Sequence, residues 1–233
     1  MKNSALIVAL FATGIMISFN NVQAQKGLQK GVEASPQFSY LVNQADIDSD
    51  RYRTKHAFNG GFGISTQVGF TENLGIGLNV LYSWQGDKYE WRGIERYKMV
   101  EYVKIPLMFT VSVPLGMDML FLGKIGPQIG ILTDAKLLNA NGTEIISDYS
   151  DAFKSADVSG MISFGLGYQI SDKLIFDWSL RYDVGLTNAE DDTYPHNIHN
   201  PFDVAVPAPS SSPRSNTSNM TLGFSLGLRY NLM

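Results

Sequence analysis

The segment that decides the fold is 158–187, with the sequence VSGMISFGLGYQISDKLIFDWSLRYDVGLT. Large apolar residues take nearly every second position up to Ile170, and they alternate without a break from Leu174 onward. A period of two places each apolar set on one face of an extended strand. The connection at 171–173 is too short for anything but antiparallel pairing. The segment is therefore predicted to form a β-hairpin.

The opposite face of this hairpin is small and mildly polar, because Gly and Ser recur there between scattered charged residues. A sheet surface that faces water is normally rich in Lys, Glu and Thr, for which Gly and Ser are poor substitutes. A transmembrane barrel reverses the usual arrangement, with apolar side chains toward lipid and polar side chains toward the interior. A soluble, lipocalin-like barrel also alternates, but its exterior would be charged. The pattern favours the transmembrane barrel.

The rest of the chain repeats this alternation. Six further alternating segments are present: 31–40, 58–70, 74–84, 97–113, 119–133 and 220–232. Short connections alternate with four long polar ones: 43–55, 85–96, 134–156 and 188–218. We predict an all-β protein, an eight-stranded antiparallel transmembrane β-barrel of the outer-membrane type, with short periplasmic turns and long outer loops. Pro106 cannot donate to a strand ladder, so a bulge or a non-bonded position is expected there.

The N-terminal segment has the features of a secretory signal. Lys2 precedes an apolar stretch at 5–17, and the small-x-small sequence at 22–24 is typical of a cleavage site. We expect residues 1–24 to be a signal peptide and residues 25–233 to be the barrel domain in the outer membrane. A membrane-anchor helix is the alternative, although its apolar core would be short. The chain has no cysteine, which excludes disulfides, thiolate metal sites and a lipidated cysteine.

Two sets of residues are predicted to shape the barrel. Charged residues of both signs lie on the inward faces of the strands: Glu33, Lys104, Lys124, Asp157, Asp177, Arg181, Asp183 and Arg229. The interior of an eight-stranded barrel is just wide enough to be filled by its side chains. We therefore expect an internal ion-pair network that plugs the barrel, with a charged, ion-conducting lumen as the alternative. Aromatic girdles are expected at both membrane rims from Tyr40, Tyr82, Trp84, Tyr97, Tyr168, Tyr182 and Tyr230.

Candidate catalytic and metal-binding residues are few. A barrel enzyme needs a His with a Ser or carboxylate partner near the rim, and the three histidines are His56, His196 and His199. The pair 196/199 could bind a metal, and Asp191-Asp192 with Glu190 could weakly hold Ca²⁺. A solvated loop explains both groups more simply. We expect no catalytic site, no cofactor and no metal.

Four segments together carry a resemblance to a known family: EYVKIPL at 101–107, GPQIG at 126–130, FGLGY at 164–168 and RYDVGLTN at 181–188. They resemble the porin-like outer-membrane β-barrel family common in Bacteroidetes, over about 31–232. The PorT-like proteins, one branch of it, are tied to a protein secretion system. The resemblance implies an eight-stranded outer-membrane barrel. Outer-membrane proteins usually end on an aromatic residue that the assembly machinery recognises, whereas this sequence ends Asn231-Leu232-Met233, so Tyr230 is expected to serve instead.

The functional expectation follows from the fold. Net charge is −4 and no Lys/Arg run suggests nucleic acid. We expect a non-enzymatic, monomeric protein that contacts outer-membrane lipid. Its outer loops would serve envelope structure, surface contacts or an envelope or secretion complex. A small-solute porin is the alternative, and a lipid-modifying outer-membrane enzyme is the third class.

Overall fold

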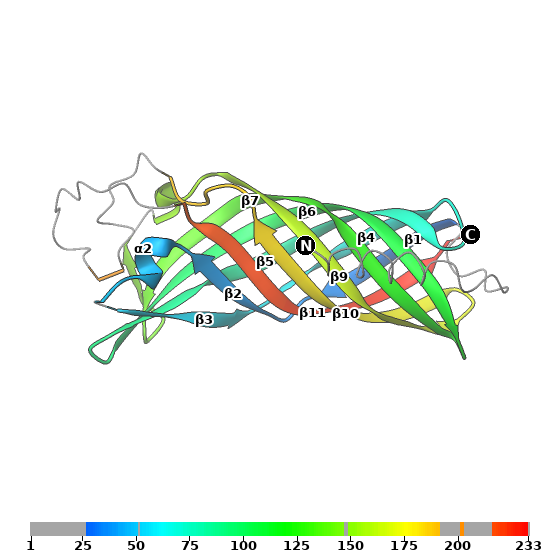
Figure 1. Cartoon of the computed structure of the whole chain (residues 1–233), viewed down its shortest axis with the longest axis horizontal. Helices are drawn as coiled ribbons and strands as arrows, with labels where there is room; N and C mark the ends of the chain where they lie inside the picture. The colour runs from blue at the N-terminus through cyan, green and yellow to red at the C-terminus, as the bar shows by residue number, and fades with distance from the viewer. Residues whose placement is uncertain (1–26, 51, 147–148, 192–200, 203–215, 233) are drawn as a thin grey trace, which may run out of the picture.

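The computed structural model describes residues 27–50, 52–146, 149–191, 201–202 and 216–232, which form one long β-barrel (Figure 1). The predicted signal peptide and the histidines at 196 and 199 lie outside the described residues. The strands are β1 Gly27–Ala34, β2 Gln37–Val42, β3 Arg53–Asn59, β4 Gly61–Gly69, β5 Leu74–Trp91, β6 Ile94–Gly116, β7 Met119–Asn139, β8 Glu144–Ile146, β9 Ala156–Ser171, β10 Leu174–Gly185 and β11 Ser218–Asn231. A short helix, α2 (Gln44–Ile47), and a 3₁₀ turn, η1 (Tyr149–Ala152), lie at the end of the barrel with the long connections.

The wall of the barrel is a closed ring of eight antiparallel strands. β1 and β2 follow one another in one wall strand, and β3 and β4 do the same in the next. β5, β6, β7, β9 and β10 continue the ring in order, and β11 closes it by pairing with β10 on one side and with β1 and β2 on the other. The predicted eight-stranded antiparallel barrel is confirmed.

Two wall strands are interrupted at the same height. The breaks fall at Ser35-Pro36 and at Gly60, and the pairing register between the two wall strands is the same on both sides of them. The backbones of Ser35 and Gly61 exchange two hydrogen bonds, of 2.8 and 3.0 Å, across the breaks. The wall therefore stays closed, although Pro36 has no N–H to give to the ladder.

The barrel wall is taller than the sequence predicts. Segment 85–96, expected to be a loop, is the paired tip of β5 and β6, which turns at Arg92-Gly93. Likewise, β7 continues through 134–139 instead of ending in a loop. The prediction was wrong because a polar composition marks contact with water, and paired strands can stand in water. β6 has 23 residues, about 50 Å along the axis at ~3.3 Å per residue and ~45° tilt.

Pro106 interrupts the ladder without a bulge. It lies opposite Gln128 of β7 in an unshifted register. On its other side, the pairing with β5 is missing between Leu107 and Lys104, again with no shift. The expected non-bonded position is therefore present, whereas the nearest register shift in β6 lies at Glu101/Tyr102.

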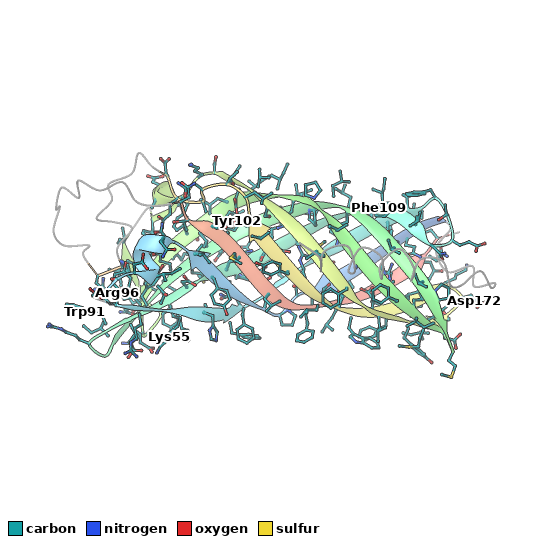
Figure 2. All side chains as sticks on the ribbon, in the orientation of Figure 1. Lys55, Trp91, Arg96, Tyr102, Phe109 and Asp172 are labelled. Carbon is teal, nitrogen blue, oxygen red and sulfur yellow. The ribbon has the colours of Figure 1, made fainter. Side chains whose placement is uncertain are left out.

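The two faces of the wall differ in chemistry over one band. On β5 the outward positions from Leu74 to Trp84 are apolar or aromatic, and on β6 those from Val103 to Val113 are apolar. Figure 2 shows Phe109 pointing away from the barrel, and its side chain is 44% exposed. Each band spans about 11 residues, the length of a tilted membrane strand. Among the described helices, none is long and apolar enough to cross a membrane.

Candidate functional site in the barrel interior

Arg181 of β10 is the centre of the interior. Its Nε donates to Asp183 Oδ1 at 2.9 Å, its Nη1 to Glu33 Oε1 of β1 at 3.1 Å, and its Nη2 to Gln128 Oε1 of β7 at 2.6 Å. Lys104 of β6 donates to Asp183 Oδ2 at 2.8 Å. Arg181 is 3% exposed and Asp183 2%. Four of the predicted interior residues therefore form one buried cluster with two positive and two negative charges, and together with Gln128 they link four strands across the lumen.

Neutral side chains complete the hydrogen bonding of this cluster. Glu33 accepts from Ser225 Oγ at 2.7 Å and from Asn79 Nδ2 at 2.7 Å. Gln128 Nε2 donates to Ser159 Oγ at 2.9 Å. A buried charge is tolerated only when its remaining donors and acceptors are satisfied, and these residues satisfy them.

A second cluster lies toward the short turns. Asp177 accepts from Arg229 Nε at 2.8 Å and from Lys124 Nζ at 3.5 Å. Arg229 Nη1 donates to Gln29 Oε1 at 3.0 Å and to Gln67 Oε1 at 3.1 Å. This cluster has two positive charges and one negative charge.

Asp157, the eighth predicted interior residue, lies close enough to Lys104 of the central cluster for their opposite charges to attract. Its Oδ1 accepts a hydrogen bond of 2.6 Å from Thr187 Oγ1. The structure thus brings seven of the eight predicted charges together in two groups and gives the last one a hydroxyl partner.

Apolar side chains fill the lumen beyond the two charged clusters. Leu120, Leu122 and Ile175 pack together inside the barrel near the short turns. Near the long connections a larger group is buried: Leu41, Val100, Tyr102, Ala135, Leu137, Tyr149, Ala152 and Phe153. Two cavities beside the charged clusters each measure about 10 Å³, which is room for about one water molecule.

A third charged group lies in the part of the barrel above the apolar outer band. Asp46 of α2 accepts hydrogen bonds from Tyr52 Oη at 2.7 Å and Tyr89 Oη at 3.2 Å. Lys98 Nζ donates to Glu190 Oε1 at 3.3 Å.

Asp87 faces Lys98 across the β5–β6 ladder, and its side chain is 3% exposed. Burial raises the pKa of the Asp87 carboxyl to about 8, although a backbone hydrogen bond from Leu41 and the charge of Lys98 oppose the shift. Most of this group was missed in the sequence because Asp46, Asp87 and Tyr89 fall in segments predicted to be loops, whereas Lys98 lies in the predicted strand 97–113 and was not singled out.

The predicted girdle aromatics lie on the outward face, where Tyr40, Tyr168 and Tyr230 are 38%, 44% and 45% exposed. Tyr82 and Trp84 pack edge to face at 5.1 Å between ring centroids. Tyr97 and Tyr182 are half-buried among their outward neighbours.

The candidate catalytic and metal-binding residues have other contacts. His56 packs on Phe38 and Tyr40, with ring centroids 5.1 and 5.8 Å apart. Glu190 is buried against Lys98. Asp191 donates its backbone N–H to Ala152, and Asp192 lies outside the described residues. Within the part of the chain that the structure describes, no three His, Asp or Glu residues are placed to hold a metal ion.

The closed ring, the apolar outer band and the polar interior agree with the comparison to known families. The model of the outer membrane protein beta-barrel domain matches residues 9–229. The chain belongs to this family. Membership places this barrel in the outer membrane, so the short turns face the periplasm and the long connections face outward. The match is to the general barrel family and does not distinguish a Bacteroidetes or PorT-like branch within it.

Comparison with solved structures finds outer-membrane proteins that are similar to this chain at low sequence identity. Neisserial surface protein A superposes with a TM-score of 0.51 and 10% identity, over 89% of this chain and 98% of that one. OprG from Pseudomonas aeruginosa gives 0.45 and 11%, over 90% and 98%. Ail of Yersinia pestis, solved with the heparin analogue sucrose octasulfate, gives 0.40 and 12%, over 87% and 99%. No curated protein matches the chain.

Several members of the interior network were not singled out in the sequence. They are neutral polar residues: Gln29, Gln67, Asn79, Gln128 and Ser225. All five lie on the inward face of their strands, so the alternation that places the charged residues in the interior could also have placed these neutral residues there.

Proposed function

We propose that this protein is a non-enzymatic outer-membrane barrel with a side-chain-filled interior. Its outer end would serve envelope structure, surface contacts or contacts within an envelope complex. The observation that carries the proposal is the Arg181 cluster, which crosses the lumen from β10 to β1, β6 and β7. Hydrated ions need a continuous wet path, and this cluster occupies the cross-section through which such a path would run.

The two apolar groups inside the barrel support the same proposal. Side chains such as Leu120 and Ile175 near the periplasmic turns, and Leu137 and Phe153 near the outer end, are at most 4% exposed. A solute would have to displace apolar packing at both ends and charged pairs between them. An open pore of this size would instead line its path with exposed polar side chains.

The outer end is the proposed contact surface. The β5–β6 hairpin stands above the apolar band, and Figure 2 places Trp91, Arg96 and Lys55 together at that end of the barrel. Function on rigid scaffolds usually resides in such projecting segments. We propose envelope or secretion-complex proteins as partners, lipid contact along the outer wall, a monomeric state and no nucleic-acid binding.

Conductance tests the proposal. The purified protein would be inserted into a planar lipid bilayer, with folding confirmed by the heat-dependent gel shift of intact barrels. We expect a silent bilayer. Discrete, reproducible current steps would contradict the filled interior and support a small-solute channel, with Lys104, Lys124 and Arg181 as the first residues to replace.

A further inference from the structure

The periplasmic cluster has more positive charge than its partners neutralise. Arg229 and Lys124 both bond to Asp177, which leaves one positive charge in excess. Asp177 is 1% exposed and Arg229 4%, so solvent does little to screen that excess. The central cluster pairs its own two cations, Arg181 and Lys104, with Asp183 and Glu33, and Asp157 lies near Lys104, so the excess is local to the periplasmic cluster.

One buried donor in this cluster, Nη2 of Arg229, has no hydrogen-bond partner among the described residues, and Arg229 is 4% exposed. Leaving a buried donor unpaired is unfavourable, so an acceptor is expected near it.

A cavity borders Arg229 and Lys124. It measures about 10 Å³ and is lined by Arg229, Lys124 and Asp177 together with Ser65, Gln67 and Asn79. Gly227 makes room for the Asp177 carboxylate beside the cavity, since a Cβ added there would meet Asp177 Oδ2 at 2.7 Å. Glu33 also borders the cavity, but its oxygens already accept from Arg181, Ser225 and Asn79.

We propose that this cavity is a binding site for one small monovalent anion of the chloride type. The anion accepts from Arg229 Nη2 and from the ammonium group of Lys124, and it balances the excess charge of the cluster. Lys124 is the least buried of the three charged residues, at 11% side-chain exposure, so its stem can move aside for an ion larger than water. The site does not depend on the function proposed for the outer end.

Thermal unfolding in detergent micelles tests the site. The melting temperature would be measured in sodium chloride and in sodium gluconate at equal ionic strength. Chloride at ten times its Kd should raise the melting temperature by about 3–6 °C over gluconate. Lys124→Met should abolish this difference, because it leaves a neutral Asp177–Arg229 pair. The matched control, Lys173→Met, removes the same charge from the exposed periplasmic turn and should retain the difference.

A crystallographic measurement on the unaltered protein keeps the test independent of how the variants fold. Crystals grown in sodium bromide should show an anomalous peak between Arg229 Nη2 and Lys124 Nζ. Equal melting temperatures in chloride and gluconate, or a bromide map without that peak, would assign the cavity to water and overturn the proposal. A chloride effect that survives Lys124→Met would also overturn it.

Discussion

Asp87 is a carboxyl group buried above the membrane band, between the attracting charge of Lys98 and the repelling charge of Asp46. Its folded-state pKa of about 8 exceeds the unfolded value of ~3.9. Between pH 4 and 8 the unfolded chain therefore releases this proton while the folded chain keeps it, so stability falls as pH rises through that window. Asp87→Asn should remove the loss and add stability on the order of a few kcal/mol at pH 8.

Chemical unfolding between pH 4 and pH 9 would measure this effect. The advantage of Asp87→Asn should shrink toward pH 4, where the wild-type carboxyl is protonated in both states. Asp151→Asn, at an exposed position of the outer end, is the control and should follow the wild-type pH dependence. An Asp87→Asn variant no more stable than wild type at pH 8 would show that Asp87 is solvated.

Arg181 is the residue whose loss should cost most. Arg181→Met leaves Asp183 and Glu33 buried without their shared cation, and breaking a buried pair in this way costs about 3–5 kcal/mol. Lys55→Met breaks an ion pair too, with Glu90, but both side chains are exposed, so little change is expected. Urea unfolding in lipid vesicles would compare the two, and equal effects would argue against the interior network.

At the scale of elements, the outer β5–β6 hairpin depends on Gly86. Its φ of +145° is one that glycine adopts readily and residues with a Cβ rarely adopt. A Cβ there would also lie 1.9 Å from the carbonyl oxygen of Lys98. Gly86→Ala should therefore lower stability by about 1–3 kcal/mol, read as a lower melting temperature. Gly123→Ala is the control, because its Cβ would meet no atom closer than 3.9 Å. Similar melting for both variants would mean that the hairpin tolerates a shift at this point.

The sequence predicts the strands inside the membrane band better than their extensions. Strict alternation identifies Arg181 and Asp183 as inward residues and Phe109 as outward, because a period of two fixes the face. It does not predict that Arg181 meets Gln128, since a contact across the lumen depends on strand tilt and stagger. Above the band both faces of β5 and β6 carry polar residues, so the sequence predicts a loop at Asp87, although the closed wall buries this residue together with Lys98.

The whole molecule is stable only if one zone of its surface meets hydrocarbon. Ile94 and Ile125 are similarly exposed, at 51% and 55%, but Ile94 lies at the tip of the β5–β6 hairpin and Ile125 in the middle of the apolar band of β7. In a soluble barrel a lysine at either position would be harmless.

In this barrel the two positions should differ. Ile125→Lys should cost about 2–4 kcal/mol, the penalty for a charge facing lipid near the bilayer midplane, whereas Ile94→Lys should cost nearly nothing. The fraction folded into vesicles over a urea series, read from the heat-dependent gel shift, measures both. Equal costs at the two positions would show that the band between Leu74 and Trp84 is not the part of the barrel that lies in the membrane. A cost confined to Ile125 would fix the barrel's depth, leaving Trp91 and the hairpin tip exposed to water, where a partner could reach them.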